Sequence, residues 1–239
     1  MKNNPTSGMA FADRTLAWRC GIGLGVFALG LAAILFIPAG RLEWWGAWAY
    51  MGILAFGGVI STPILLRVNP EMVEERFHLR RRAAQKADVE IGAVMVAFWF
   101  SALVGSGLDK RFGWSPAMSP SVQYVGVVIG SVGYILSIWA MAVNKFFALL
   151  VRIQTERGHV VVATGPYRFV RHPGYAGGIL LFMATPVILG SQWAFIPMAL
   201  AACSLVFRTA AEDHSLQEGL EGYREYACKV PYRLLPCVW

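Results

Sequence analysis

The sequence predicts an all-α fold: a polytopic transmembrane helical bundle of about six crossings, the last two a short helical hairpin, with a C-terminal cytosolic amphipathic helix. Three observations lead to this prediction. Hydrophobic residues make up 56% of the 239 residues and charged residues only 15%, whereas a soluble domain averages about 45–50% apolar and about 25% charged. The 13% content of aromatic residues excludes a disordered chain, which is poor in aromatics. Long uncharged stretches alternate with short basic segments, as in membrane proteins.

Four uncharged stretches in the first part of the chain are long enough to cross a bilayer, which takes about 20 largely apolar residues. They are residues 20–37, 44–66, 91–108 and 122–143. The first stretch is longer than the apolar region of a signal peptide, about 7–15 residues, so we expect it to be retained as a span. Trp44, Trp45 and Trp48 open the second stretch, as expected at a membrane–water interface.

The last uncharged stretch, residues 174–207, is too long for one crossing. As a single helix its 34 residues would measure about 51 Å, against a bilayer core of about 30 Å. Gly190-Ser191-Gln192 offers a turn at its centre, which predicts a hairpin with arms at 175–189 and 193–207. We expect Pro186 and Pro197 to kink these arms.

The residues from Arg208 to about Cys228 follow the hairpin with a different pattern. Leu216, Leu220 and Tyr223 share one face of a helix, while most other positions are polar. This pattern predicts a separate amphipathic helix that lies at the interface or docks onto the bundle.

Two glycine patterns are interpreted as helix-packing surfaces. Gly21-x-Gly23-x-Gly25 lies inside a predicted span, whereas a dinucleotide-binding glycine loop must follow a strand. Gly126-x-x-x-Gly130 has the spacing by which small residues bring membrane helices together.

The distribution of basic residues predicts the orientation in the membrane. Of the 21 Lys and Arg residues, only Arg41, Lys110 and Arg111 lie in the segments 38–43 and 109–120. The others gather in the N-terminus, the loop 67–90, the segment 145–173 and the tail from Arg208. The positive-inside rule places these four segments, and with them both termini, in the cytoplasm. The basic loop 67–90 is interpreted as a topology signal, with contact to anionic membrane lipids as the alternative.

Composition and spacing exclude several classes of function. The net charge of +7 arises in these loops, so we expect no nucleic-acid partner. The four cysteines contain no C-x-x-C pair and the four histidines no H-x-x-x-H spacing, so we predict no metal site. No predicted span carries an ionisable residue at its centre, although ion-coupled transporters and pumps usually need one. Any chemistry must therefore lie at a membrane face.

Two polar segments that flank the hairpin form the candidate site. Residues 154–175 read QTERGHVVVATGPYRFVRHPGY, with two histidines, two tyrosines and three arginines. Arg208 and Glu212 are four residues apart and share one face of a helix. Closure of the hairpin brings the two segments together, so they can form one site. The alternative for Arg208 and Glu212 is an ordinary intrahelical ion pair.

Three motifs occur together in this part of the chain. They are Gly165-Pro166-Tyr167-x-x-x-Arg171-His172-Pro173-x-Tyr175-x-Gly177, Arg208-x-x-x-Glu212-Asp213 and Tyr223-x-x-Tyr226-x-x-x-Val230-Pro231. The combination resembles the isoprenylcysteine carboxyl methyltransferase family over roughly residues 144–236, and phospholipid N-methyltransferases share a looser form. Asn69-Pro70-Glu71 is a weaker similarity upstream. We expect a four-span membrane region at 1–143, followed by a cofactor-binding methyltransferase region with the hairpin at 144–239.

The resemblance implies an integral membrane enzyme, in the cell membrane if the chain is prokaryotic, that uses S-adenosylmethionine in a cytosolic pocket. It implies a lipophilic acceptor that arrives from the bilayer, first of all a carboxylate of the isoprenylcysteine type. Carried over by position, the cofactor contacts are Gln154, His159, Val160, Val161, Val162, Tyr167, His172, Pro173, Gly174, Tyr175 and Glu212. Arg208 matches an arginine placed at the substrate, and we assign Arg208 and Tyr175 to catalysis.

The residue types fit this chemistry. Tyr167 and Tyr175 offer ring faces to an adenine or a sulfonium, and His172 with the helix start at Pro173 can hold a carboxylate. Gly177-Gly178 allows the close approach of a bulky group. Methyl transfer is an in-line displacement that mostly needs positioning and exclusion of water.

The residues alone leave three functions open. A carboxylate acceptor is already ionised, needs no base and can be held by Arg208. An amine acceptor, in a phospholipid or another small molecule, needs a base, for which Glu212 and Asp213 are candidates. Transfer of the methyl group to a sulfur atom of a small molecule is a further alternative. In a non-enzymatic membrane scaffold, the same charged residues would have only a structural role. Arg171 is open between cofactor contact and salt bridge, whereas Tyr223 and Tyr226 are expected to pack the C-terminal helix.

Overall fold

The computed structural model describes residues 5–73, 86–148 and 152–239, with side chains described from residue 16 in the first range and residue 89 in the second. Half of the basic loop 67–90, residues 74–85, lies outside the described residues, so the topology signal expected there stays a prediction. The described residues form only helices, turns and irregular segments. The predicted all-α, polytopic class is confirmed, and the chain is a multi-pass membrane protein.

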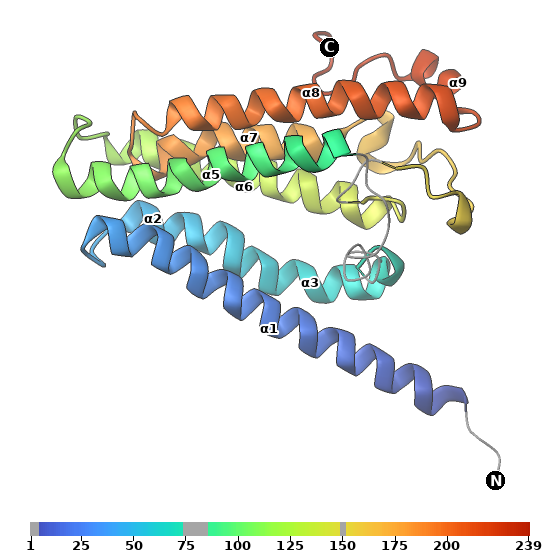
Figure 1. Cartoon of the computed structure of the whole chain (residues 1–239), viewed down its shortest axis with the longest axis horizontal. Coiled ribbons are helices and arrows are strands. Elements are labelled where there is room, and N and C mark those ends of the chain that lie inside the picture. The colour runs from blue at the N-terminus through green and yellow to red at the C-terminus, as the bar shows by residue number, and fades with distance from the viewer. Residues whose placement is uncertain (1–4, 74–85, 149–151) are drawn as a thin grey trace.

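The helices follow one another along the bundle in the order shown in Figure 1. They are α1 (Pro5–Ala39), α2 (Trp45–Met51), the π-helical turn η1 (Gly52–Phe56), α3 (Gly57–Val68), α5 (Lys86–Phe112), α6 (Pro120–Val143), the 3-10 turns η3 (Thr155–Arg157) and η4 (Gly165–Arg168), α7 (Pro173–Leu189), α8 (Phe195–Gly219) and α9 (Tyr223–Lys229). Within the described residues, five helical stretches are long and apolar enough to cross a membrane: Leu16–Ala39, Trp45–Val68, Val89–Phe112, Pro120–Val143 and Phe195–Gly219.

The four predicted spans correspond to these first four stretches, each a few residues longer than its uncharged run. The second span is continuous through α2, η1 and α3. Helix α7 has 17 residues and is therefore about 26 Å long, shorter than a bilayer core of about 30 Å. The sixth crossing remains a prediction.

The predicted chain reversal at Gly190 is present. Gly190 ends α7 in the left-handed conformation with φ +70°, which glycine adopts without a steric penalty. The N–H of Ser191 donates to the carbonyl of Pro186 at 3.0 Å, so the helix end is capped in the manner of a Schellman turn. Pro197 lies in the first turn of α8, where its missing N–H has no intrahelical partner to lose, so a kink is not required there.

The predicted separate amphipathic helix from Arg208 to Cys228 is wrong in its boundaries. The second hairpin arm continues without a break as α8 to Gly219, and α9 then begins at Tyr223. The physical reason is that no helix breaker lies between 207 and 218, whereas Gly222 turns the chain at φ +77°. As a result, Arg208 and Glu212 stand on the same rigid helix as the membrane arm.

Glycines bring α6 and α7 into backbone contact. A Cβ on Gly133 would lie 2.6 Å from the carbonyl oxygen of Gly177, so neither position tolerates a side chain without a shift. Gly126 and Gly130 face Val187 and Ile188 of α7, which confirms their predicted packing role. The space expected beside Gly177-Gly178 for a bulky ligand group is instead filled, at Gly177 by α6 and at Gly178 by Leu205 of α8.

The packing surface predicted at Gly21-x-Gly23-x-Gly25 is not formed by the described residues. A Cβ on any of these three glycines would meet no described atom within 4 Å. Figure 1 shows the reason: α1 leaves the bundle toward its N-terminal end.

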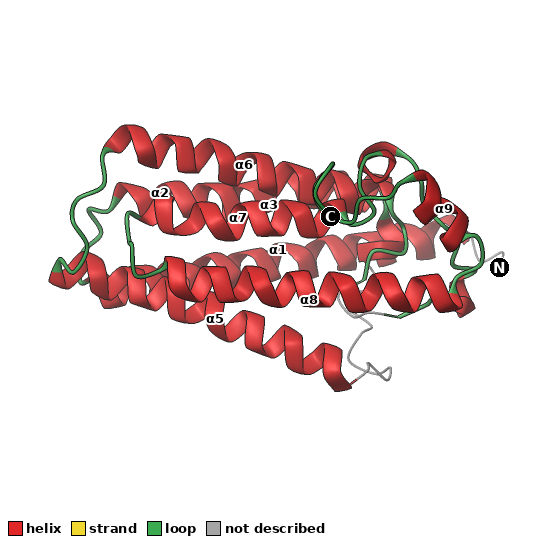
Figure 2. Cartoon of the chain, turned by 90° about the horizontal axis from the view of Figure 1, so that it is seen from above, coloured by secondary structure: helices red, strands yellow, loops and turns green. Residues whose placement is uncertain are grey.

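The polar segments meet at one end of the bundle. Both views place α9 and the irregular segments before α7 at the end opposite the α7–α8 turn (Figures 1 and 2). The hairpin therefore carries the two polar segments to the same end, as its closure predicts.

Candidate functional site

A cavity of about 530 Å³ opens where the two polar segments meet. Its walls come from the end of α6, the segments around η3 and η4, the first turn of α7, the end of α8 and α9. Nine of the predicted site residues line it: His159, Val160, Val161, Val162, Tyr167, His172, Gly174, Tyr175 and Glu212.

Three predicted site residues do not line the cavity: Gln154, Pro173 and Arg208. Gln154 is fully buried, and its side chain is occupied within the chain. Its amide nitrogen donates to the carbonyl of Phe146 at 2.7 Å, and its amide oxygen accepts from Arg157 at 2.5 Å. Gln154 is thus placed to hold the loop that forms the cavity wall rather than to face a ligand. Pro173 is buried at the first position of α7, as its residue type predicts.

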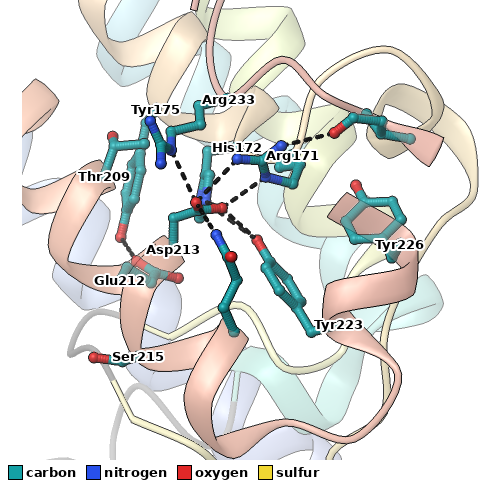
Figure 3. Close-up of polar contacts among 12 residues, drawn as sticks. Arg171, His172, Tyr175, Thr209, Glu212, Asp213, Ser215, Tyr223, Tyr226 and Arg233 are labelled. Carbon is teal, nitrogen blue, oxygen red and sulfur yellow. Dashed lines mark hydrogen bonds and ion pairs between the residues drawn. The ribbon is translucent and has the colours of Figure 1, made fainter. Parts of the chain in front are cut away.

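The two hairpin helices are joined at the cavity by Tyr175 and Glu212. The Tyr175 hydroxyl, from α7, donates to a Glu212 carboxylate oxygen on α8 at 2.5 Å (Figure 3). Arg208 lies one turn before Glu212 and is buried, with its guanidinium carbon 5.7 Å from the centre of the Tyr175 ring. This arrangement is a cation–π contact. Tyr175 therefore contacts both charged residues that the sequence singles out, and its own ring lies parallel to that of His172.

Asp213 is the centre of a buried network that orders the same helices (Figure 3). Arg171 donates to both carboxylate oxygens, at 2.7 and 2.9 Å, and Arg233 adds a third bond at 2.8 Å. Tyr223 and Gln217 donate at 3.0 and 2.8 Å, and the His172 ring lies 3.3 Å away. A carboxylate has about four lone-pair sites, so these partners saturate it.

Saturation of Asp213 bears on two alternatives that the sequence leaves open. Asp213 is fully buried, neutralised by two guanidinium groups and outside the cavity lining, so it is not placed to act as a base. Arg171 is in a salt bridge, although it also lines the cavity. Tyr223 and Tyr226 pack the end of the chain as predicted, and both also line the cavity.

The segment after α9 closes the site through main-chain contacts. The N–H groups of Arg171 and His172 donate to the carbonyls of Tyr232 and Arg233, each at 2.9 Å. The Arg171 guanidinium also donates to the carbonyls of Val230 and Pro231 at 2.8 Å. The backbone of Val230-Pro231, at the end of the third motif, thereby completes the shell around Arg171. Sequence reasoning missed Gln217 and Arg233, because only the fold brings them to Asp213.

His159 is a neutral side chain at neutral pH. Burial, together with the nearby Arg157 and Arg152, lowers its pKa to about 4. Its Nδ1 accepts the N–H of Gln154 at 3.2 Å, and its ring stacks on Phe146 with centroids 4.3 Å apart. The proton is therefore on Nε2, which leaves one N–H donor on a cavity-lining ring.

Three of the tyrosines that line the cavity keep their phenol protons at neutral pH. Burial raises the pKa of Tyr167, Tyr223 and Tyr226 above the ordinary phenol value. The Tyr226 hydroxyl donates to the carbonyl of Tyr167 at 2.7 Å, which fixes one cavity wall to another.

Comparison with known proteins identifies the family that this part of the chain resembles. The family model described as isoprenylcysteine carboxyl methyltransferase (ICMT) family matches residues 125–218. The resemblance carried by the sequence motifs is confirmed. The ICMT-matched region runs from α6 to the end of α8, and so it contains most of the cavity walls, Tyr175, Arg208 and Glu212.

Two curated relatives show how far the similarity extends. A protein of Oryza sativa subsp. indica named probable protein-S-isoprenylcysteine O-methyltransferase is 32% identical over 118 residues, 46% of this chain and 59% of the relative. The mouse protein Delta(14)-sterol reductase TM7SF2 is 30% identical over 90 residues, 36% of this chain and 22% of the relative. This chain thus spans less than two thirds of either relative.

A solved structure shares the fold over nearly the whole chain. It is described as the eukaryotic intramembrane Ras methyltransferase ICMT without a monobody. The match has a TM-score of 0.54 at 17% sequence identity and covers 99% of this chain and 88% of that chain. The ICMT-like arrangement therefore includes the first four spans, where the sequence motifs are weak.

Proposed function

We propose that this chain is an integral membrane methyltransferase that moves a methyl group from S-adenosylmethionine to a lipophilic carboxylate of the isoprenylcysteine type. The observation that carries the proposal is the cavity that the ICMT-matched region and α9 line together beside the Tyr175–Glu212 contact. The names of the methyltransferase relatives support the same reaction class.

The cavity fits S-adenosylmethionine in size and in donor set. Its volume of about 530 Å³ lies within the range of about 300–1,000 Å³ typical of small-molecule sites. Glu212 can accept from an amino group or ribose hydroxyls, and His159 offers an N–H donor. Val161, Leu216 and Leu220 form an apolar cluster in the same cavity, which suits the adenine ring. When bound, the cofactor supplies an electrophilic methyl group on a sulfonium.

The residues of the chain would then position two reactants and keep out water. Tyr175 lines the cavity and fixes the Glu212 carboxylate, which orients it for the cofactor. Arg208 lies one turn farther along α8 toward the membrane arm, against the Tyr175 ring. An acceptor carboxylate that comes from the bilayer would meet Arg208 there, and a guanidinium holds a carboxylate in a bidentate pair. The ionised carboxylate needs no base, which agrees with the saturation of Asp213.

We further propose that the cavity faces the cytoplasm and that the acceptor is a lipidated molecule within the membrane. At the cavity end lie Lys145, Arg152, Arg157, Arg168, Arg224 and Lys229, whereas the opposite end has Arg41 after α1 and Lys110 and Arg111 at the end of α5. This asymmetry supports the orientation because basic residues stay in the cytoplasm. The apolar side chains exposed on the spans contact membrane lipids.

A binding titration tests the cofactor assignment. Purified protein in detergent is expected to bind S-adenosylmethionine, and Glu212→Ala to raise the Kd at least about tenfold, equal to about 1.4 kcal/mol. Glu225→Ala, which removes an exposed carboxylate from α9, is the matched control. Reduced nicotinamide dinucleotide serves as a second ligand because one relative is a reductase. Binding of that dinucleotide with no binding of millimolar S-adenosylmethionine would contradict the proposal.

Transfer of a labelled methyl group identifies the acceptor. Incubation with membrane extract and with a prenylcysteine analogue is expected to give a base-labile methyl ester. Base-stable label in an amine would instead support an N-methyltransferase. Glu212 is then the one carboxylate of the acidic pair that faces the cavity and is placed to take the proton.

A further inference from the structure

Asn69 is a buried amide that caps a helix other than its own. It ends α3 and is 4% exposed, so its polar atoms need partners. Its amide nitrogen donates to the carbonyls of Met141 and Asn144, at 2.7 and 3.0 Å. The Met141 carbonyl lies in the last turn of α6, and the Asn144 carbonyl, which also accepts the N–H of Phe147 at 3.1 Å, lies directly after the helix. The end of the second span therefore caps the helix that leads into the cavity wall.

Asn144 links Asn69 to the wall of the cavity. Its side-chain oxygen accepts the N–H of Phe146 at 2.9 Å, and its amide nitrogen donates to the Tyr167 hydroxyl at 3.2 Å. Asn144, Phe146 and Tyr167 all line the cavity, whereas Asn69 does not. Asn69 thus bonds directly to Asn144 and is linked through it to Phe146 and Tyr167.

Glu71 is connected to the same cavity wall by a second series of hydrogen bonds. Its carboxylate accepts from Arg157 at 3.1 Å, and Arg157 donates to Gln154, which holds the carbonyl of Phe146. The Glu71 side chain is 65% exposed, and exposed ion pairs contribute little. We therefore expect the Asn69 path to dominate.

We propose that Asn69 is a positioning residue for the cofactor cavity: its amide sets the end of α6 and thereby the placement of Asn144 and Tyr167. This inference rests on the proposed function. It assigns a role in cofactor binding to a residue of the four-span region that does not line the cavity and lies outside the ICMT-matched residues 125–218.

The test compares two residues, Asn69 and Ser61, whose side chains each join α3 to α6 through part-buried hydrogen bonds. Asn69→Asp keeps the shape but removes both N–H donors, so the carbonyls of Met141 and Asn144 each lose one hydrogen bond and face a carboxylate instead. Ser61→Ala removes the contact of Ser61 with the Tyr134 hydroxyl, 3.1 Å away, about two turns earlier on α3. Asn69→Asp is expected to raise the Kd for S-adenosylmethionine about tenfold, and Ser61→Ala to leave it within about twofold. In turnover, the KM for the cofactor should rise more than kcat falls.

Two further measurements distinguish a role of Asn69 in positioning the cavity wall from a general loss of folding. Tryptic cleavage after Arg157, followed by mass spectrometry without any cofactor, should be faster in Asn69→Asp than in Ser61→Ala. The Tyr167→Phe variant lacks the hydroxyl that Asn144 contacts. In that variant, Asn69→Asp should raise the Kd for S-adenosylmethionine less than it does in wild type. If Asn69→Asp gives no folded protein, Asn69→Ser replaces it, because serine keeps one hydrogen-bond donor. The Kd of Asn69→Ser for S-adenosylmethionine should lie between that of wild type and the about tenfold higher value expected of Asn69→Asp.

The outcomes are distinguishable. Wild-type protein that fails to bind S-adenosylmethionine overturns the proposed function, while the cleavage assay still tests the wall. Wild-type protein that binds, with the Asn69 variants and Ser61→Ala equal in both affinity and cleavage, overturns the positioning role alone.

Discussion

The hydroxyl of Tyr175 donates to the carboxylate of Glu212 at 2.5 Å, across the two helices of the hairpin. The ring that carries this hydroxyl also lies against the guanidinium of Arg208. One side chain therefore connects the residue placed for the cofactor with the residue placed for the acceptor. Substitutions of Tyr175 can separate the contact of its hydroxyl with Glu212 from the contact of its ring with Arg208.

Tyr175→Phe removes the hydroxyl and keeps the ring. We expect a loss of about tenfold in cofactor affinity, because Glu212 loses a charge-assisted hydrogen bond. Tyr175→Leu also removes the ring and should in addition raise the KM for the acceptor. Titration and initial-rate kinetics of both variants measure the two effects, and equal behaviour of the variants would show that the contact with Arg208 has no role.

Asp213→Asn should destabilise the whole cavity end. The substitution leaves Arg171 and Arg233 without their buried anionic partner, and breaking a buried pair costs about 3–5 kcal/mol. Thermal unfolding in detergent is expected to show a large fall in Tm. Glu218→Gln, which removes an exposed pair with His214, is the control and should change little. A Tm for Asp213→Asn equal to that of the control would disprove the network's structural role.

Gly133→Ala should disturb the packing of α6 against α7. The added methyl group would lie 2.6 Å from a backbone oxygen of Gly177, and overpacking costs about 1–3 kcal/mol. Gly92→Ala, on α5 with no described atom within 4 Å of the new Cβ, is the control. The yield of monodisperse protein and its Tm measure the difference, and a Gly133→Ala variant as stable as Gly92→Ala would refute the close contact.

Stability should fall on acidification through His159. The folded pKa of about 4 lies below the ordinary value of about 6.5. Between these values the unfolded chain binds a proton that the folded chain does not, so stability is lost as the pH drops from 6.5 toward 4. In His159→Gln, Tm should depend less steeply on pH over this window. Parallel curves for the two proteins would contradict the buried, neutral assignment.

The parts of the fold that follow from local chemistry could be predicted. Gly190 marks the chain reversal because a helix end needs a left-handed residue there, and Pro173 marks the start of α7. The continuation of α8 through Arg208 was missed because a polar face was taken for a new helix, although no breaker separates the two.

The partners of buried charges could not be predicted. Arg233 and Gln217 meet Asp213 only because α9 and the tail fold back on α8. Gln154 was predicted from the family resemblance to contact the cofactor, yet its amide donates to the carbonyl of Phe146 and accepts from Arg157. Such assignments depend on long-range geometry, which spacing along the chain does not contain.

Photo-crosslinking of labelled S-adenosylmethionine tests the central claim most directly. Ultraviolet irradiation of the complex, trypsin digestion and mass spectrometry would locate the bound cofactor. We expect label in the peptides 158–168 and 209–224, which carry His159, Tyr167 and Glu212, and loss of that label in Glu212→Ala. Label confined to peptides of the first four spans, or labelling that excess unlabelled cofactor does not displace, would contradict a cofactor site in this cavity.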